Sequence, residues 1–351
     1  MFTKKSWLRL IKIAPKAIFF HIIILNGFTN SSFCQFSIVS TGTNTSINSI
    51  KAQGDTIVLS GLENYFAKSF DTSQSVISYT APGLSGYNNY DLAIVTTGEY
   101  FIVSGLHSPT YNYKILKSTN SGLNWNTIFD TTGMTVLTFS MLDAGFGIGA
   151  GNFGDIIITN DSGGTWAYSN LGSNLMFVAS KSFNDSTLAL GAFEYLAVSN
   201  DRGQNWMINY FNQSDPSAIH FVNKDTIYVT SYFWNGWESF FTKSYDGGNS
   251  WQTISLGQGF GVYDLFFDTP EHGYIVGHNY NTSEGVVFET NNYGDNWAVF
   301  ATGVNSEFLE FISINDSMAL ISGTNGILLK WDKIIPLNIT KPSVHIEFSI
   351  Y

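Results

Sequence analysis

The amino-acid sequence predicts an all-β fold in which a unit of four short antiparallel strands repeats seven times around a closed ring. Three observations lead to this prediction. A turn motif recurs along the chain, an apolar strand that ends in a small residue recurs with it, and the composition is rich in glycine (33 residues) and aromatic residues (16%) but poor in charged ones (12%). Many tight turns between half-buried strands need such a composition. The predicted architecture is a seven-bladed β-propeller.

The turn motif reads Ser/Thr-x-Asp/Asn-x-Gly-x-x-Trp, where x is any residue. Five complete copies occupy residues 118–125, 159–166, 199–206, 244–251 and 290–297. Their third residues are Asn120, Asp161, Asp201, Asp246 and Asn292, and their last residues are Trp125, Trp166, Trp206, Trp251 and Trp297. A degenerate copy at 69–76 keeps Asp71 but has Ser73 in place of Gly and Val76 in place of Trp. The strand at 326–332 resembles the strand that enters a motif, so the chain holds seven units.

The apolar strand that ends in a small residue gives the same count. Its first copy is at 56–61, and another strand precedes it in later units, as at 219–222, 263–267 and 308–314. One unit therefore reads strand A, turn, strand B, loop, strand C, turn motif, strand D. Units must stack to bury both of their faces, and a closed ring leaves few exposed edges. We expect residues 36–39 to complete the last unit, in competition with 334–339, where Pro336 removes a hydrogen-bond donor.

Each residue of the motif suits a tight hairpin between strands C and D. Asp161 can accept hydrogen bonds from backbone amides two residues further on, and Gly163 can supply a positive φ. Trp166 can fold its ring over the turn, where replacement by alanine costs about 3–5 kcal/mol when such a ring is buried. The alternative is a calcium site at Asp71, Asp161, Asp201 and Asp246. Each turn offers one carboxylate whereas calcium takes six to eight oxygens, so a capping role is favoured and no metal is expected.

These repeats resemble the Asp-box, or BNR repeat, of a propeller superfamily that includes sialidases, Vps10-type sorting receptors, family 74 xyloglucanases and the photosystem assembly factor Ycf48. The resemblance covers residues 36–333 and rests on five complete copies of the motif and one degenerate copy. It implies a β-propeller. It also implies that the motifs lie on the face opposite the ligand site.

The N-terminus reads as a secretory signal over residues 1–34. A basic segment precedes an apolar run at 17–25, and small residues then lead to a cleavage site after Cys34, which leaves Gln35 first. An uncleaved anchor would need a longer apolar run, and lipidation of Cys34 would need a small residue where Phe33 stands. Removing five basic residues takes the net charge from −11 to −16, which disfavours nucleic acid as a partner. No cysteine then remains, so no disulfide is expected.

Three segments follow: a signal at 1–34, a propeller at 35–339 and a tail at 340–351. The tail resembles the linker that leads into the C-terminal sorting domain of Bacteroidetes type IX secretion substrates, although a simple terminal tail is the favoured interpretation. We therefore expect a bacterial protein that is secreted or held at the cell surface, with the periplasm and the outer membrane as alternatives, and with no membrane span after cleavage.

Enzyme functions find little support in the sequence. Sialidases bind their substrate carboxylate with three arginines, whereas this chain has only Arg9, in the signal, and Arg202, inside a turn motif. Family 74 glycosidases place carboxylates from two propellers in a shared cleft. The acids expected in loops or strand starts near the open face are Glu194, Asp215, Asp264, Glu284 and Glu307, and no motif pairs any two of them. No nucleophile or cofactor motif is present, so no catalytic residue and no cofactor is assigned.

The loops between strands B and C, hereafter the BC loops, are rich in aromatic residues. Exposed rings beside Asn and Gly suit sugars or peptide side chains. The ligand-binding candidates are Trp234, Trp237, Tyr195, Tyr280, Tyr111 and Glu194. By contrast, Tyr65, Phe153 and Phe193 are expected to pack between blades or to plug the central channel. The sequence thus favours a secreted, non-catalytic recognition propeller for a glycan or protein partner. The alternatives are a glycoside hydrolase-like enzyme with an unfamiliar carboxylate pair and a spacer within a larger surface protein.

Overall fold

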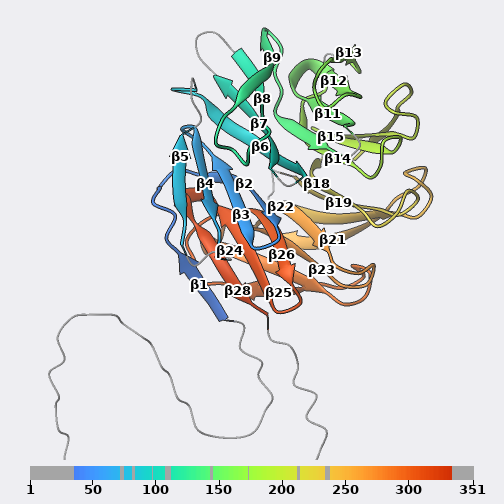
Figure 1. Ribbon diagram of the computed structural model, residues 1–351. Coiled ribbons are helices and arrows are strands. Elements are labelled where there is room, and N and C mark those ends of the chain that lie inside the picture. The colour runs from blue at the N-terminus through green and yellow to red at the C-terminus, as the bar shows by residue number, and fades with distance from the viewer. Residues whose placement is uncertain are drawn as a thin grey trace, which may run out of the picture. The chain divides into compact units, whose positions relative to one another are not determined.

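The computed structural model describes residues 35–333 except 72–74, 81–83, 97, 107–111, 143–144, 173, 212–213 and 234–237. The chain divides into two units, Met1–Phe33 and Cys34–Tyr351, and the described residues belong to the second. This unit contains seven four-stranded antiparallel sheets arranged in a ring, with the first blade (blue) beside the last (red) (Figure 1). The predicted seven-bladed β-propeller is confirmed. The signal at 1–34 and the tail at 340–351 lie outside the described residues.

Six blades take four consecutive strands each, A to D from the channel outward. Blade 1 comprises β2 (Ile47–Gln53), β3 (Thr56–Gly61), β4 (Tyr65–Ser69) and β5 (Ile77–Thr80). Blade 2 comprises β6 (Asn88–Thr96), β7 (Glu99–Leu106), β8 (Asn112–Ser118) and β9 (Asn126–Thr132). Blade 3 comprises β10 (Thr138–Met141), β11 (Gly147–Ala150), β12 (Asp155–Thr159) and β13 (Ala167–Asn170).

The next three blades repeat this order. Blade 4 comprises β14 (Phe177–Ser182), β15 (Leu188–Ala192), β16 (Tyr195–Ser199) and β17 (Met207–Tyr210). Blade 5 comprises β18 (Asp215–Phe221), β19 (Ile227–Phe233), β20 (Glu238–Ser244) and β21 (Gln252–Gln258). Blade 6 comprises β22 (Phe260–Phe267), β23 (Gly273–Asn279), β24 (Glu284–Thr290) and β25 (Ala298–Ala301).

Blade 7 combines the two ends of the ring. Its strands are β26 (Phe308–Asn315), β27 (Met318–Gly323), β28 (Leu328–Asp332) and, on the outside, β1 (Gln35–Val39). The register places Phe36 opposite Trp331 and Val39 opposite Leu328. The Phe36 and Trp331 rings lie 5.6 Å apart. Strand β1 therefore covers the edge of β28 that would otherwise be open, and it joins the start of the ring to its end.

The core lies between the blades. The B strands, such as β3, β11 and β15, are buried along almost their whole length because they are covered on both faces, whereas the D strand β13 is exposed throughout. A cluster that includes Ile148, Ile156, Phe177 and Leu190 joins residues of blades 3 and 4. Helices in the described part of the chain are single 3₁₀ turns, η1 (Asn152–Gly154) and η2 (Thr324–Gly326), and none is long and apolar enough to cross a membrane.

The turn motif closes on itself through side-chain hydrogen bonds. In blade 3 the Thr159 hydroxyl donates to the Asp161 carboxylate (2.8 Å) and accepts from the Gly163 amide (2.9 Å). Asp161 accepts from both the amide and the hydroxyl of Thr165, each at 2.8 Å. The predicted bond to an amide two residues further on is wrong: Asp161 reaches the amide four residues on. The reason is that two successive residues adopt positive φ: Gly163 (84°), as predicted, and also Ser162 (56°). Together they turn residue 165 back over the carboxylate.

All the remaining copies of the motif, including the degenerate one, have the same hydrogen bond to the amide four residues further on. Its acceptors are Asp71, Asn120, Asp201, Asp246 and Asn292, at 2.8–3.0 Å. Bonds from Ser250 lower the pKa of Asp246 to about 2, and bonds from the turn amides hold the pKa values of Asp161 and Asp201 below their ordinary range. The bonding oxygens of these side chains therefore hold their own turns closed.

The motif tryptophans connect neighbouring blades. The indole N–H donates to the carbonyl of the motif glycine in four copies, at Trp125, Trp206, Trp251 and Trp297 (2.9–3.1 Å). In blade 3, a methyl group on Gly163 would lie 3.3 Å from the Trp166 ring and would overlap Cδ1 of Ile128, which belongs to blade 2. The Trp166 ring also lies 5.8 Å from Phe129 of blade 2. The complete motifs thus connect each of blades 2 to 6 to the blade before it.

Candidate functional site

The BC loops and the turn motifs lie at opposite ends of the strands. Strand β16 begins with Tyr195, beside the BC loop, and ends with Ser199, the first residue of a turn motif. Glu194 and Tyr195 therefore lie on the face formed by the BC loops and the D-to-A connections, hereafter the BC face. Tyr280 lies on the same face in blade 6. The other three binding candidates, Trp234, Trp237 and Tyr111, lie outside the described residues.

Two phenylalanines of the BC face are exposed. Phe153 is 61% exposed and Phe193 is 42% exposed, whereas Tyr65 is only 8% exposed. The expectation that these rings pack inside the protein is confirmed for Tyr65 and is wrong for Phe153 and Phe193. Both rings stand in tight BC turns, where a positive φ occurs at Phe153 itself (60°) and at Glu194 (62°), the residue after Phe193.

Phe153 combines exposure with an unfavourable backbone conformation. Its 3₁₀ turn in blade 3 has the same geometry as the turn in blade 7, where the equivalent middle residue is Asn325 (φ 57°). Asparagine adopts positive φ readily, whereas a bulky residue there is an outlier that persists at a cost of about 1–3 kcal/mol. The exposed ring of Phe153 gains little burial to offset that cost.

A slot of about 210 Å³ opens between blades 4 and 5. Its aromatic walls are Tyr210 and Phe211 from the end of blade 4 and Phe240 and Trp251 from blade 5. The Phe211 and Trp251 rings meet edge to face at 5.4 Å. The ring of Tyr210, which is 56% exposed, lies 5.5 Å from the ring of Tyr195. The predicted binding residue Tyr195 therefore lies next to the rim of the slot.

A small residue keeps this slot open. Ser214 lies two residues before Pro216, which pairs with strand B just ahead of the bulge in β18. The residues at the same place in the adjoining blades are Leu175, two before Phe177, and Phe260, two before Val262. Leu175 is buried in the core between blades 3 and 4, and Phe260 packs 5.2 Å from Phe288 in blade 6. Ser214 therefore leaves empty the volume that larger side chains fill at the neighbouring interfaces.

The loops of the BC face contain acidic residues, but no BC loop or D-to-A connection contains lysine or arginine. Three acids adjoin residues that line the blade 4–5 slot: the Glu194 carbonyl accepts the Phe211 amide, Asp215 follows Ser214, and Glu238 lies two residues before Phe240. The Asp215 carboxylate accepts the Glu194 amide at 3.1 Å, and burial, aided by the charge of Glu194, raises the pKa of Asp215. Arg202 lies at the opposite end of blade 4, where it pairs with Asp185. The face therefore suits positively charged groups and lacks the arginine clamp of a sialidase.

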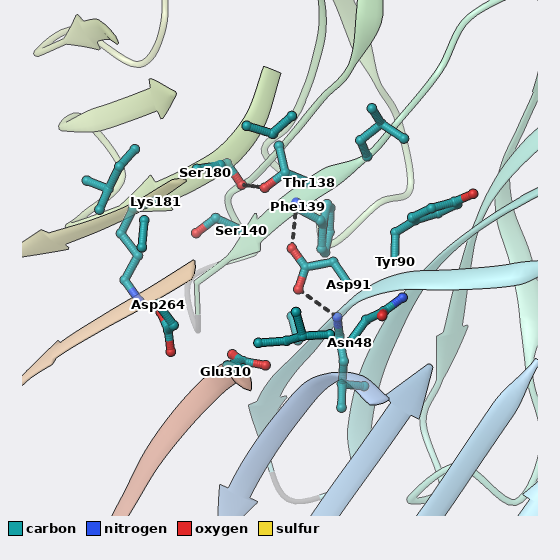
Figure 2. A pocket seen from close by; sticks show the side chains of 18 of the residues that line it. Asn48, Tyr90, Asp91, Thr138, Phe139, Ser140, Ser180, Lys181, Asp264 and Glu310 are labelled. Atoms are coloured by element: carbon teal, nitrogen blue, oxygen red, sulfur yellow. Dashed lines mark hydrogen bonds between the residues drawn. The ribbon is translucent and has the colours of Figure 1, made fainter. Parts of the chain in front are cut away.

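A second hollow, of about 320 Å³, lies in the central channel, where the A strands of all seven blades contribute to its wall (Figure 2). Carboxylates in this wall accept backbone amides of the next blade. Asp91 accepts the Phe139 amide (2.9 Å) and Asp264 accepts the Phe311 amide (2.8 Å). Glu310 accepts the amide of Ile50 in blade 1 (2.6 Å). An A strand is the inner edge of its blade, so these carboxylates satisfy amides that have no partner strand.

The channel carboxylates are electrostatically coupled. Glu310 forms an ion pair with Lys51. Burial raises the pKa of Asp264 to about 7, with repulsion from Glu310 as the next cause, and burial raises the pKa of Asp91 to about 6. Asp264 thus lies within a strand of the channel wall, which corrects the expectation of a loop or strand start at the open face. The reason is that the β-bulge at Tyr263 shifts the register and aims the next side chain into the channel.

Tyr280 lies among tyrosines that border the channel hollow. Its hydroxyl is 2.5 Å from that of Tyr263, which lines the hollow, and the ring of Tyr232 lies 5.9 Å from that of Tyr263. Burial raises the pKa of Tyr232 to about 12, with the charge of Asp215 as the next cause. Of the predicted binding residues that the structure describes, Glu194 and Tyr195 thus lie together at blade 4, and Tyr280 lies near the channel.

The channel residues Lys51, Asp91 and Glu310 were not found by the sequence reasoning. A signal for part of this set was present, because the tripeptide Tyr-Asp-Leu occurs at 90–92 and again at 263–265. Both copies occupy the bulged segment of an A strand. A comparison of the A strands alone would therefore have aligned the two aspartates.

Comparisons with known proteins place the fold among seven-bladed propellers. No family model and no curated protein matches the chain. A structure of YCF48 bound to D1 peptide superimposes with a TM-score of 0.68 at 19% identity, covering 87% of this chain and 99% of that one. A GH74 xyloglucanase from Xanthomonas campestris gives 0.63 at 14% identity, covering 84% of this chain and 53% of that one. The WD40 repeats of RRP9 give 0.64 at 11% identity over 86% and 99%. At these identities the likeness concerns the fold alone.

Proposed function

We propose that this propeller is a non-catalytic recognition module that binds a segment of another protein on its BC face. The observation that carries the proposal is Phe153, a ring that is 61% exposed on a backbone with φ of 60°. Backbone strain is enriched at ligand-binding sites, and the exposed ring of Phe153 gains little burial to offset it. Phe193 and Tyr210 extend the aromatic surface over blade 4.

Protein is the favoured partner class, and a glycan is the alternative. A similar propeller, YCF48, was solved with a peptide, and both structures consist of one ring of similar length. The loops of the BC face also contain acidic residues but no lysine or arginine, which favours a partner with positive charge over a neutral sugar. Aromatic rings serve either partner, so the distinction rests on the charge of the face.

The test is a selection from a random peptide library displayed on phage, run beside a glycan array, with residues 35–351 as the immobilised protein. We expect peptides to be enriched and Phe153→Asn to abolish their binding without unfolding the ring, since asparagine already occupies the equivalent turn at Asn325. Leu123→Asn is the matched control, because Leu123 is 65% exposed on the opposite face. Binding to glycans only, or peptide binding that survives Phe153→Asn but not Leu123→Asn, would refute the proposal.

We also propose that the chain is an exported member of the Asp-box propellers. The basic and apolar segments of residues 1–34 and the recurrent turn motif support this proposal. N-terminal sequencing of the protein from a bacterial host should find Gln35 as the first residue. An intact Met1, or a lipid on Cys34, would contradict cleavage after Cys34.

A glycoside hydrolase is the second candidate. The observation that favours it is the contact of Glu194 with Asp215, whose pKa is raised, next to exposed aromatic rings. A raised pKa on one of two neighbouring carboxyls suits a general acid. Turnover of a polysaccharide panel that is lost in both Glu194→Gln and Asp215→Asn would establish this function, and no turnover on any member would remove it.

A further inference from the structure

The blade 4–5 slot has the size and lining of a side-chain pocket. Its volume is about 210 Å³, and four aromatic residues form its walls. A dry apolar cavity of about 150 Å³ holds a benzene ring, so the slot has room for one aromatic or branched aliphatic side chain. Thr242 is 2% exposed at its base, where its hydroxyl meets that of Thr253 at 3.1 Å. The Thr242 hydroxyl at the bottom of the slot thus has a hydrogen-bond partner within the protein, and a ligand need not supply a polar group there.

The surroundings of the slot select the charge of what enters. The Glu194 carbonyl accepts the amide of the lining residue Phe211 (2.7 Å), Glu238 begins strand β20 two residues before the lining residue Phe240, and Asp215 adjoins Ser214. The loops of this face supply no lysine or arginine to neutralise them. Tyr210 and Phe193 provide exposed rings beside the carboxylates, where cationic side chains can interact with both.

We propose that the slot receives one aromatic or branched side chain of an extended protein segment whose adjacent residues are lysine or arginine. This inference rests on the proposed function and defines the partner: an apolar anchor enters between blades 4 and 5, and its basic neighbours contact Glu194 and Glu238. Buried anchors with charged flanks are a common arrangement at interfaces, because the anchor gives affinity and the charges give orientation.

The probe is a fluorescein-labelled synthetic peptide with lysines on both sides of a central phenylalanine, measured by fluorescence anisotropy. One companion peptide has alanine in the centre, and another has glutamates in place of the lysines. We expect the phenylalanine peptide to bind the wild-type protein at least about tenfold more tightly than the alanine peptide, and the glutamate peptide not to bind. Equal binding of the phenylalanine and alanine peptides, or no binding of either, would overturn the proposal.

Filling the slot should remove the preference for phenylalanine. Ser214→Leu copies the residue that closes the neighbouring interface, but it removes bonds to Phe211 (2.7 Å) and Ser231 (3.1 Å) and can lower stability. Thr253→Phe fills the slot from the exposed outer strand and removes a different bond, that between the Thr253 and Thr242 hydroxyls (3.1 Å), and Gln252→Phe on the same strand is its control. We expect the ratio of the two affinities to fall close to one in both slot variants and to stay unchanged in the control.

The charge component has separate variants. Glu194→Gln combined with Glu238→Gln should weaken the lysine peptide several-fold and reduce the effect of salt on its affinity, whereas Glu63→Gln in blade 1 should not. Library-selected peptides could bind through Phe153 while the Ser214→Leu and Thr253→Phe variants bind every synthetic peptide as the wild type does. That result would reject the slot as the binding site and would leave the proposed function of the BC face supported. If no peptide binds the BC face at all, the proposed function falls with it.

Discussion

Adding one methyl group to Gly163 tests whether the turn motif fastens neighbouring blades. In Gly163→Ala the new carbon would overlap Cδ1 of Ile128 in blade 2 and would have to adopt φ of 84°. A positive φ costs an L-residue about 1–2 kcal/mol, and overpacking costs about 1–3 kcal/mol more. Gly133→Ala is the matched control: its φ is 86° and no atom lies within 4 Å of the added carbon, so it carries the backbone cost alone.

Thermal unfolding followed by circular dichroism measures the difference. For a ring of this length the unfolding entropy makes each kcal/mol worth about 1–2 °C, so Gly163→Ala should melt a few degrees below Gly133→Ala. Ile128→Val removes the atom that the methyl group meets. In Gly163→Ala with Ile128→Val we therefore expect the combined loss to be about 1 kcal/mol or more smaller than the sum of the single losses.

Two results would refute this reasoning. If Gly163→Ala melts at the same temperature as Gly133→Ala, the motif glycine serves its own turn only and not the contact with the preceding blade. If the losses from Gly163→Ala and Ile128→Val simply add, the contact exists but transmits no strain between blades.

Three further predictions concern closure and pH. A chain that begins at Thr41 lacks β1, so we expect a lower melting temperature and concentration-dependent light scattering from the open edge of β28, and an unchanged melt would contradict closure by β1. The folded pKa of Asp264 (about 7) lies above its unfolded value of 3.8, so its ionisation opposes folding as pH rises from 4 to 7. Asp264→Asn, which can still accept the Phe311 amide, should therefore gain stability relative to wild type across that interval in urea titrations, and a constant difference would argue against the shift. The pKa shift of Asp246 has the opposite sign: its folded pKa is about 2, so its carboxylate contributes stability above pH 4 that is lost as the pH falls toward 2. Asp246→Asn should reduce this loss of stability between pH 4 and pH 2, and Asp246→Ala should also lower the melting temperature at neutral pH.

Although it predicted the wrong amide as the partner of Asp161, the sequence alone determined the number of blades and which residues form the turns. The reason is that a hairpin is specified within a few residues: the hydroxyl of Thr159, the carboxylate of Asp161 and the positive φ of Gly163 all act inside one motif. Repetition of such a local unit reveals the fold class without any knowledge of distant contacts.

Only the tertiary structure revealed the slot between blades 4 and 5. The slot exists because Ser214 stands where Leu175 and Phe260 stand in adjoining blades, and its walls come from two blades at once. The channel network likewise joins Glu310 of the last blade to Lys51 of the first. A cavity forms where the side chains of neighbouring blades do not fill the space between them, and an ion pair forms where two side chains face each other. Both depend on residues that are far apart in the chain, so neither produces a repeating pattern in the sequence.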